Sequence, residues 1–228
     1  MKGSSGFLAS FLSAGFIGVV LGSELPLQID TSFDKKEALE SWQPRSGSEW
    51  SWKKTPEGGL YQLKKPGSPG KFRRPLSWSV WKGKPVACFE VEVTARCLTS
   101  LKVKGRDVLV IFGFQDPDHY YYVHFSAENS KVHNILAKVD GGERTPLPLK
   151  GKRHPRLVKD GFQQLKLTHD PATGEIEASV DGKVILRAVD RDLKGGYVGV
   201  GSFDDKVDFD RFVLRGEPID GSEPSRAK

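Results

Sequence analysis

Short strand-like runs, each followed by turn-forming residues, are the feature that most limits what this chain can fold into. Runs such as DVLVIFGFQ, YYYVHFSA and KVILRAVD are rich in β-branched and aromatic residues, the types that favour strands. Asp-Gly pairs at 140–141, 160–161 and 181–182 separate several of the runs, and glycine accepts the positive φ of a tight hairpin without penalty. Only residues 32–42 have some helical character. The pattern therefore predicts an all-β fold, an antiparallel sandwich.

The two ends of the chain depart from this pattern. The run GFLASFLSAGFIGVVLG is apolar and rich in small residues, and it stops just before Ser23 and Glu24. Residues 1–23 are therefore predicted to be a secretory signal peptide, with an uncleaved N-terminal anchor as the alternative. Residues 24–216 form the predicted domain, and the polar residues 217–228 form a predicted disordered tail. Either interpretation exports the domain, so we expect a secreted, periplasmic or cell-surface protein with no transmembrane segment after signal removal.

Export permits disulfides, yet the chain has only two cysteines, Cys88 and Cys97. They flank the strand-like FEVEVTAR, and nine positions along one strand would separate them by about 30 Å. A disulfide needs Cα atoms about 4.4–6.8 Å apart. We therefore expect two unpaired thiols and a domain that is stabilised by its hydrophobic core.

Basic residues concentrate in two runs, Lys64–Pro75 and Lys150–Arg156, in a chain whose formal net charge is +6. Both runs contain proline and glycine and lack helical periodicity, so they are predicted loops. One interpretation is a solvated loop, and the other is attraction to an acidic polymer such as a sulfated or uronic polysaccharide. Nucleic acid is not an expected partner, because the protein is exported and no nucleic-acid motif is present.

The stretch DPDHYYYVHF, Asp116–Phe125, places three consecutive tyrosines in one strand. Successive side chains of a strand point to opposite faces, so aromatic rings must lie on both faces. If the turn centres on Pro117 and Asp118, Gly113 lies opposite Tyr122 and leaves room over its ring. The same register pairs Phe114 with Tyr121 and Phe112 with Val123, so that Val108, Val110, Phe112 and Phe114 share a core face with Tyr121, Val123 and Phe125.

The opposite face of this hairpin is the candidate binding site. It contains Gln115, Tyr120, Tyr122 and His124, and the next strand adds Asn134 and Lys138 if its core residues are His133, Ile135, Ala137 and Val139, with Arg144 near the rim. Pyranose faces stack on aromatic rings, while phenol, amide and imidazole groups form hydrogen bonds with hydroxyls. A slip of one residue would exchange His133 for Asn134. The alternative is that these side chains merely cover a solvent-exposed sheet.

Four stretches carry a resemblance to a known family. They are FGFQDPDHYYYVHF, HNILAKVDGGERTPL, GFQQLKLTHDPATGEIEASVDGK and GYVGVGSFDDKVDFDRFVLRG. Together with FDKKEALESWQPRSGSEWSWKKTPEGGLYQLKK they resemble the concanavalin A-like lectin/glucanase superfamily, in particular laminin-G-like domains and exported domains related to the 3-keto-disaccharide hydrolases. The resemblance extends from about Thr31 to Gly216.

This resemblance implies a two-sheet jelly roll whose concave sheet holds carbohydrate, with Tyr120, Tyr122 and His124 in the groove. Some members of the superfamily bind a structural calcium ion, and oxygen ligands suit that cation. The segment SFDDKVDFD offers such ligands, namely Asp204, Asp205, Asp208 and Asp210. Acidic turns also occur without metal, so a structural calcium ion and a metal-free turn are the two alternatives, and no other cofactor is expected.

Motifs for catalysis are weak. Glu90 with Glu92 and Glu175 with Glu177 each share a strand face, but neither pair has the Glu-x-Asp-x-x-Glu pattern of the glucanases, and solvent-facing carboxylates explain both. A polysaccharide lyase needs a tyrosine or histidine as base and a cation or amide to stabilise an enolate. The candidate face contains those residue types.

We therefore expect an exported, lectin-like module that recognises a polysaccharide, either neutral or acidic, without turnover. The alternatives are a carbohydrate-active enzyme, either a lyase or a glycoside hydrolase, on the same face, and a laminin-G-like protein-interaction domain.

Overall fold

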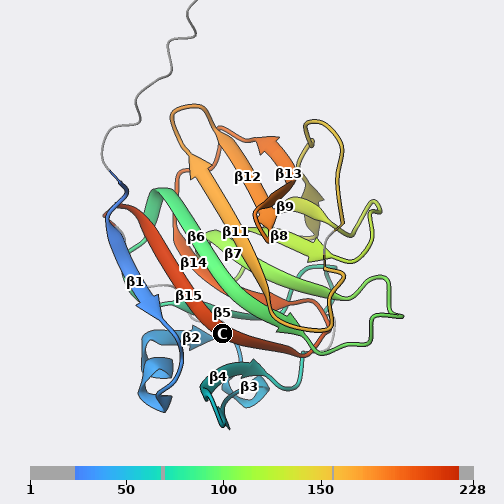
Figure 1. Ribbon diagram of the computed structural model, residues 1–228. Coiled ribbons are helices and arrows are strands. Elements are labelled where there is room, and N and C mark those ends of the chain that lie inside the picture. The colour runs from blue at the N-terminus through green and yellow to red at the C-terminus, as the bar shows by residue number, and fades with distance from the viewer. Residues whose placement is uncertain (1–23, 68–69, 156, 221–228) are drawn as a thin grey trace, which may run out of the picture.

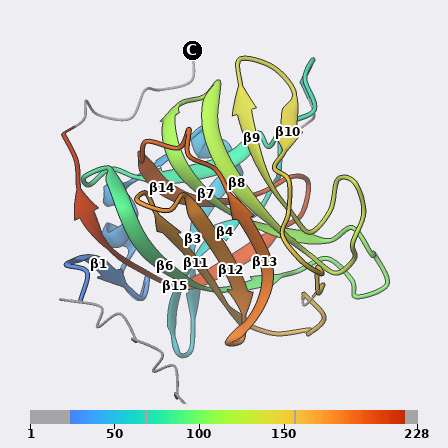
Figure 2. The same cartoon turned by 90° about the horizontal axis from the view of Figure 1, so that it is seen from above.

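Two antiparallel β-sheets pack face to face in the protein (Figure 1; Figure 2). The computed structural model describes residues 24–67, 70–155 and 157–220, so the predicted signal peptide and residues 221–228 of the predicted tail lie outside the described residues. The predicted all-β sandwich of the jelly-roll kind is confirmed. In the described part of the chain, no helix has the length and apolar character needed to cross a bilayer.

The first sheet has eight strands. They are β1 (Leu27–Thr31), β3 (Trp50–Thr55), β4 (Gly58–Leu63), β6 (Val86–Cys97), β11 (Gln163–Asp170), β12 (Glu175–Val180), β13 (Lys183–Val189) and β15 (Val207–Pro218). Their order across the sheet is β13-β12-β11-β6-β15-β4-β3, with β1 also paired to β15. The long central strands β6 and β15 therefore bring both halves of the chain into one sheet.

The second sheet has seven strands and carries the tyrosines. They are β2 (Trp42–Pro44), β5 (Ser77–Trp81), β7 (Asp107–Asp116), β8 (His119–Ser126), β9 (Ile135–Asp140), β10 (Arg144–Pro146) and β14 (Tyr197–Ser202), in the order β10-β9-β8-β7-β14-β5-β2. The stretch with helical character forms only a short 3-10 helix, η1 (Lys36–Ser41), and a second one, η2 (Gly47–Glu49), precedes β3.

The main core lies between the two sheets. Alternate residues of β6, including Val91 and Val93, are fully buried there, as are Val110 and Phe112 of β7. A second apolar cluster covers the outer face of the seven-stranded sheet and includes Trp78. Two layers of buried side chains therefore enclose this sheet, which explains why β7 is apolar at nearly every position.

The ends of β6 and β15 bear on two predictions, the unpaired thiols and the C-terminal end of the domain. Cys88 and Cys97 are both free thiols near opposite ends of β6, as predicted. β15 continues to Pro218, two residues beyond the predicted domain end, and the Ile219 N–H donates to the Pro85 carbonyl at 2.9 Å. The start of the predicted tail is therefore part of the sheet.

Candidate functional site

The β7–β8 hairpin has the predicted turn but not the predicted register. Asp116 lies opposite His119, yet Phe112 pairs with Tyr121 because the register shifts between Phe112 and Asp116. The shift is a bulge at Gly113, whose φ of 55° favours glycine. A Cβ at Gly113 would lie 2.3 Å from the Leu193 Cδ1 atom. Gly113 therefore makes room for Leu193, and the prediction that it leaves space over the Tyr122 ring is wrong.

The bulge also changes the face of the sheet on which the residues that follow it in β7 lie. Phe112 remains in the main core, but Phe114 joins the outer cluster with Tyr120 and Tyr122. The prediction that Phe114 shares the face of Phe112 is therefore wrong. A bulge adds one unpaired residue, so strict alternation fails across it.

The face that carries Tyr120, Tyr122 and His124 is buried. These side chains are 1%, 0% and 1% exposed. The Tyr120 hydroxyl donates to the Pro75 carbonyl at 2.8 Å, and the Phe203 ring lies 6.1 Å from the ring of Tyr122. The expected open groove on this face is therefore closed by other parts of the chain.

The first basic run supplies much of this cover. An Arg74 guanidinium nitrogen lies 2.6 Å from a carboxylate oxygen of Asp118, at the hairpin turn. The Arg144 N–H donates to the Arg73 carbonyl, and both arginines stack on Phe203, at 5.6 Å for Arg73 and 4.6 Å for Arg144. The end of this predicted loop, residues 73–75, therefore packs on the sheet, whereas Lys64, Lys65 and Lys71 are exposed.

The residues of strand β9 that share the face of Tyr120, Tyr122 and His124 are not the expected ones. Ile135, Ala137 and Val139 are buried as predicted, but they pair with His124, Tyr122 and Tyr120 and share their face. Lys138 lies opposite Tyr121 on the other face. Asn134 precedes the strand, with a φ of 50° and no exposed surface, and its amide donates to Asn129 at 2.7 Å. The prediction that Asn134 and Lys138 join the tyrosine face is wrong, because pairing to β8 fixes the faces of β9.

A cleft of about 480 Å³ opens at the turn end of the hairpin. We call it the β8 cleft; its lining includes Gln115, His119, Tyr120, Tyr121, Lys138, Asp140, Asp192, Leu193, Lys194 and Gly195. Three of the seven predicted binding residues, Gln115, Tyr120 and Lys138, therefore lie around one cavity. Tyr122, His124, Asn134 and Arg144 do not line it.

Neighbouring groups hold the polar side chains of the β8 cleft in place. The Gln115 amide donates to the Gly195 carbonyl at 2.8 Å. The Tyr121 hydroxyl donates to Asp190 at 3.4 Å. Burial raises the pKa of the Tyr121 phenol, as do the negative charges of Asp190 and Asp192. The phenol therefore stays a neutral hydrogen-bond donor.

The charges at the rim of the β8 cleft are mixed. The Lys138 ammonium lies 3.8 Å from Asp192. The His119 Nδ1 atom is 2.9 Å from the Asp116 carboxylate, and its Nε2 atom is 3.6 Å from Asp140. An aromatic ring beside amide, imidazole, ammonium and carboxylate groups suits a ligand with many hydroxyls.

Sequence reasoning missed two parts of this cleft. Tyr121 was predicted to lie on the core face, and it does pack against the main core, but it is only half-buried and also lines the cavity. No pattern in the sequence predicted a role for the segment containing Asp192 and Leu193. The only signals for it were Gly113 and the Gly195-Gly196 pair, since interior glycines accompany close approach of another segment.

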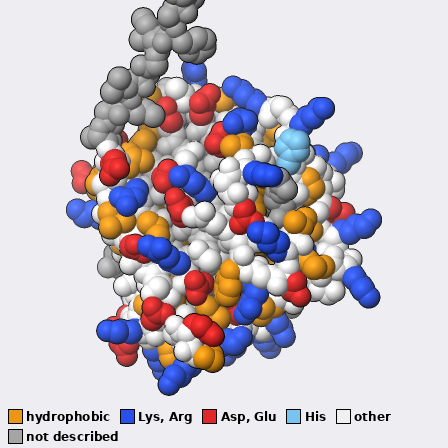
Figure 3. All heavy atoms as spheres, viewed as in Figure 1, with side chains coloured by type: hydrophobic (Ala, Val, Ile, Leu, Met, Phe, Trp, Pro, Cys, Tyr) orange, Lys and Arg blue, Asp and Glu red, His pale blue; other side chains and the backbone are white. Residues whose placement is uncertain are grey.

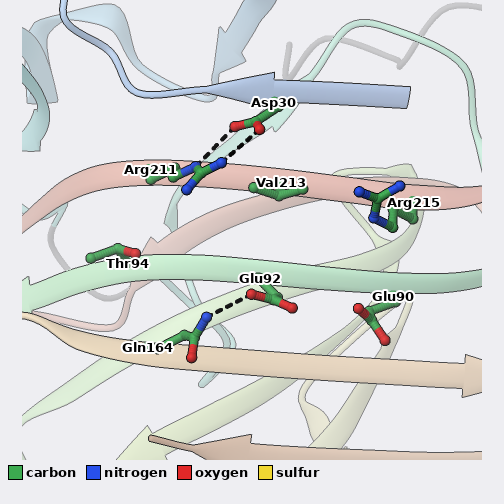
Figure 4. A pocket seen from close by; sticks show the side chains of 8 residues that line it. All are labelled: Asp30, Glu90, Glu92, Thr94, Gln164, Arg211, Val213 and Arg215. Carbon is green, nitrogen blue, oxygen red and sulfur yellow. Dashed lines mark hydrogen bonds and ion pairs between the residues drawn. The ribbon is translucent and has the colours of Figure 1, made fainter. Parts of the chain in front are cut away.

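A second hollow, of about 200 Å³, lies on the outer face of the eight-stranded sheet (Figure 4). The Lys166 ammonium lies 2.7 Å from Glu90 and 3.4 Å from Glu92, and Gln164 donates to Glu92 at 2.6 Å. Arg211 makes a two-point ion pair with Asp30. These carboxylates are neutralised by neighbours on an exposed surface, which supports the interpretation of the glutamate pair as solvent-facing.

The predicted calcium ligands are separated. Asp204 and Asp205 lie with Asp107, each offering an oxygen within 4.8 Å of the others. Asp208 is fully buried elsewhere and accepts hydrogen bonds from Gln62 and Arg96, both at 2.6 Å. Its assignment to this site is therefore wrong.

The acidic cluster fits calcium poorly. Asp107 accepts hydrogen bonds from Ser202 and from the Phe203 N–H, and its other oxygen is 3.0 Å from the His124 Nε2 atom. Asp205 accepts from the Asp107 N–H at 2.7 Å. Calcium takes six to eight oxygen ligands, whereas these oxygens already serve the protein. Burial, followed by the charge of Asp107, raises the pKa of Asp205 to about 6.

Comparisons with known proteins identify the fold to which this two-sheet architecture belongs. No family model and no curated protein sequence matches the chain. The carbohydrate binding module CBM66 from Bacillus subtilis superposes with a TM-score of 0.53 at 16% identity, over 77% of this chain and 96% of the module. The chain has the concanavalin A-like sandwich fold.

Other proteins with this concanavalin A-like sandwich give similar values. The β-glucanase of Bacillus licheniformis superposes with a TM-score of 0.53 at 12% identity, over 83% of this chain and 98% of the enzyme. The κ-carrageenase of Pseudoalteromonas carrageenovora, in complex with an oligotetrasaccharide of κ-carrageenan, gives 0.51 at 13%, over 89% and 98%. At these identities the likeness shows the fold, and function must be argued from the site.

Proposed function

We propose that the chain is an exported carbohydrate-binding domain that takes a saccharide in the β8 cleft. The observation that carries the proposal is the cavity of about 480 Å³ in which the partly exposed Tyr121 lies beside Gln115, His119 and Lys138. A pyranose ring would stack on Tyr121, and the amide and ammonium groups would bind its hydroxyls. The fold supports this, because a carbohydrate binding module, a β-glucanase and a κ-carrageenase share it.

The charge of the cleft favours an uncharged saccharide. The two lysines of the lining, Lys138 and Lys194, are balanced by its two aspartates, Asp140 and Asp192. Arg144, which favoured an acidic ligand, stacks on Phe203 and is not part of the lining. A strongly anionic polymer would therefore meet repulsion from the two aspartates as well as attraction.

Binding without turnover agrees with the electrostatics of Tyr121. A lyase base must lose its proton near neutral pH, whereas burial and nearby aspartates raise the pKa of this phenol. The apolar N-terminal run of the sequence supports export to a compartment where polysaccharides occur. We therefore place the domain outside the cytoplasm with a polysaccharide or glycan as its partner.

A glycan-array screen of the full chain, followed by calorimetry with the best ligand, tests the proposal. Tyr121→Ala is expected to weaken binding about tenfold, since a ring contact contributes about 0.5–1.5 kcal/mol beyond area burial. Lys138→Ala should also weaken it. The matched control is Lys166→Ala, because both lysines are about one-third exposed and pair with carboxylates, but Lys166 lies on the other sheet.

Two results would count against the proposal. Binding that survives Tyr121→Ala would place the saccharide elsewhere on the molecule. No binding to any glycan would favour a protein ligand, as in the laminin-G-like alternative.

A further inference from the structure

Exposed apolar side chains gather at one end of the sandwich. Among the described residues, seven large apolar side chains are exposed, and six of them lie in three loops: Leu98, Leu101 and Val103; Val132; and Val158 and Phe162. The seventh, Leu27, is in β1. Single exposed apolar residues are ordinary, but their concentration in one region marks an interaction site.

Strand pairing places the three loops at the same end. The first loop follows Cys97 of β6, and the third leads into Gln163 of β11, which pairs with Ala95 of β6. The second loop follows Ser126 of β8, which pairs with Asp107 at the start of β7, where the first loop ends. We call residues 98–106, 127–134 and 157–162 the loop end.

Contacts between the loops hold the loop end together. The Arg106 side chain is buried and donates to the Lys159 carbonyl at 3.4 Å and to the Cys97 carbonyl at 2.8 Å. The backbone at Gly105 approaches the His133 ring so closely that an added Cβ would lie 3.0 Å from it. The apolar side chains are therefore presented from a connected surface.

The charge of the loop end is positive. Four lysines are exposed there, Lys102, Lys104, Lys131 and Lys159, against the exposed Asp160 and the half-buried Glu128, and among the described residues only Lys159 of the four pairs with a neighbouring acid, Asp181, at 2.8 Å. Lysines alternate with apolar residues in the sequence LKVKG. In Figure 3, Lys and Arg side chains protrude along the right edge of the molecule with hydrophobic side chains between them, on the side where Figure 1 shows these loops.

We propose that the loop end docks onto an anionic lipid surface. Apolar side chains such as Leu101 and Val103 enter the boundary between headgroups and acyl chains, while the lysines contact lipid phosphates. A soluble polyanion would account for the lysines but would leave the exposed apolar side chains without a role. The proposal does not depend on saccharide binding, because the β8 cleft is at the turn end of β8 and the loop end is at its other end.

Hydrogen exchange of the full chain tests this with positional resolution. In vesicles of phosphatidylcholine mixed with phosphatidylglycerol, backbone amides of residues 98–106 and 127–134 are expected to gain protection that phosphatidylcholine vesicles do not give. Because the apolar run before residue 24 can itself bind lipid, the protection must be read at the loops. Protection confined to the N-terminal residues would overturn the proposal.

Variants of the full chain separate lipid from a polyanion. Leu101→Ser with Val103→Ser should remove loop protection and lower vesicle binding, and Lys102→Ala with Lys104→Ala should lower it by about fivefold for each lysine. The control is Leu27→Ser, because the Leu27 side chain is 51% exposed, close to the 48% of Leu101. If dextran sulfate protects the loops and only the lysine variant loses that protection, while the serine variant binds vesicles normally, the surface recognises a polyanion and the lipid proposal fails.

Discussion

Replacing Asp208 with alanine is expected to destabilise the domain by about 3 kcal/mol, at the lower end of the range for breaking a buried ion pair. The carboxylate is fully buried, and it accepts hydrogen bonds of 2.6 Å from both Gln62 and Arg96. Alanine would leave the Arg96 charge without its carboxylate. We expect no larger loss of stability, because the Arg96 side chain is 32% exposed and stacks on Phe162. Water can therefore partly solvate the Arg96 charge.

Two further substitutions calibrate this value. Asp208→Asn keeps an oxygen that can accept from Gln62, so it should cost less than alanine. Lys53 also approaches Asp208, at 3.6 Å, but its side chain is 43% exposed, and exposed ion pairs contribute about 0–1 kcal/mol. Lys53→Ala should therefore change the free energy of unfolding by less than about 1 kcal/mol.

Urea denaturation followed by circular dichroism gives these free energies when the m-value is unchanged. The reasoning is refuted if Asp208→Ala costs no more than Lys53→Ala. The same assay in calcium and in EDTA tests the competing assignment of Asp208 as a metal ligand. That assignment requires a calcium-dependent stability that disappears in Asp208→Ala, whereas the ion-pair account expects the same cost in both buffers.

Three other substitutions follow from the structure. The raised pKa of Asp205 means that the folded protein holds this proton more tightly than the unfolded chain, whose ordinary value is 3.8. The free energy of unfolding should therefore fall by at most about 3 kcal/mol as pH rises from about 4 to 6, and Asp205→Asn should lack this part of the pH profile in urea titrations. Gly113→Ala should cost about 1–2 kcal/mol because of its positive φ, and it should weaken saccharide binding by displacing Leu193; unchanged calorimetry would contradict this. Tyr120→Phe should cost about 1–2 kcal/mol in urea by removing its bond to the Pro75 carbonyl, and it should speed proteolysis at residues 70–76; an unchanged cleavage rate would show that this bond does not hold the segment.

The sequence was sufficient to predict the sandwich, because hydrophobic alternation and turn residues are local signals. The same signals predicted that Asp116 would face His119. They failed at Gly113, where a residue with positive φ inserts a bulge that alternation cannot reveal. One inserted residue moved Phe114 to the other face and changed the partner of Tyr121.

Whether a side chain is exposed was harder to predict than the face of the sheet on which it lies. Alternation placed Tyr120, Tyr122 and His124 on one face, and they do share it. Whether that face is open depends on segments distant in the chain, since Pro75 and Phe203 lie against it. Of the predicted binding residues, Gln115 and Lys138 remain accessible at the edge of this cover, whereas Tyr120 lines the β8 cleft but is only 1% exposed.

The two ends of the β7–β8 hairpin carry different chemistry on one rigid element. The turn end has amide, phenol and imidazole groups around the β8 cleft, whereas the other end has lysines and exposed apolar residues. β8 has eight residues, so a domain docked by its loop end would hold the β8 cleft about 25 Å from the lipid. Because the length of β8 separates the two sites, Tyr121→Ala should leave vesicle binding unchanged, and Leu101→Ser should leave saccharide affinity unchanged. Loss of both activities in either variant would instead indicate that the substitution perturbs the sandwich, and neither site could then be assigned from that variant.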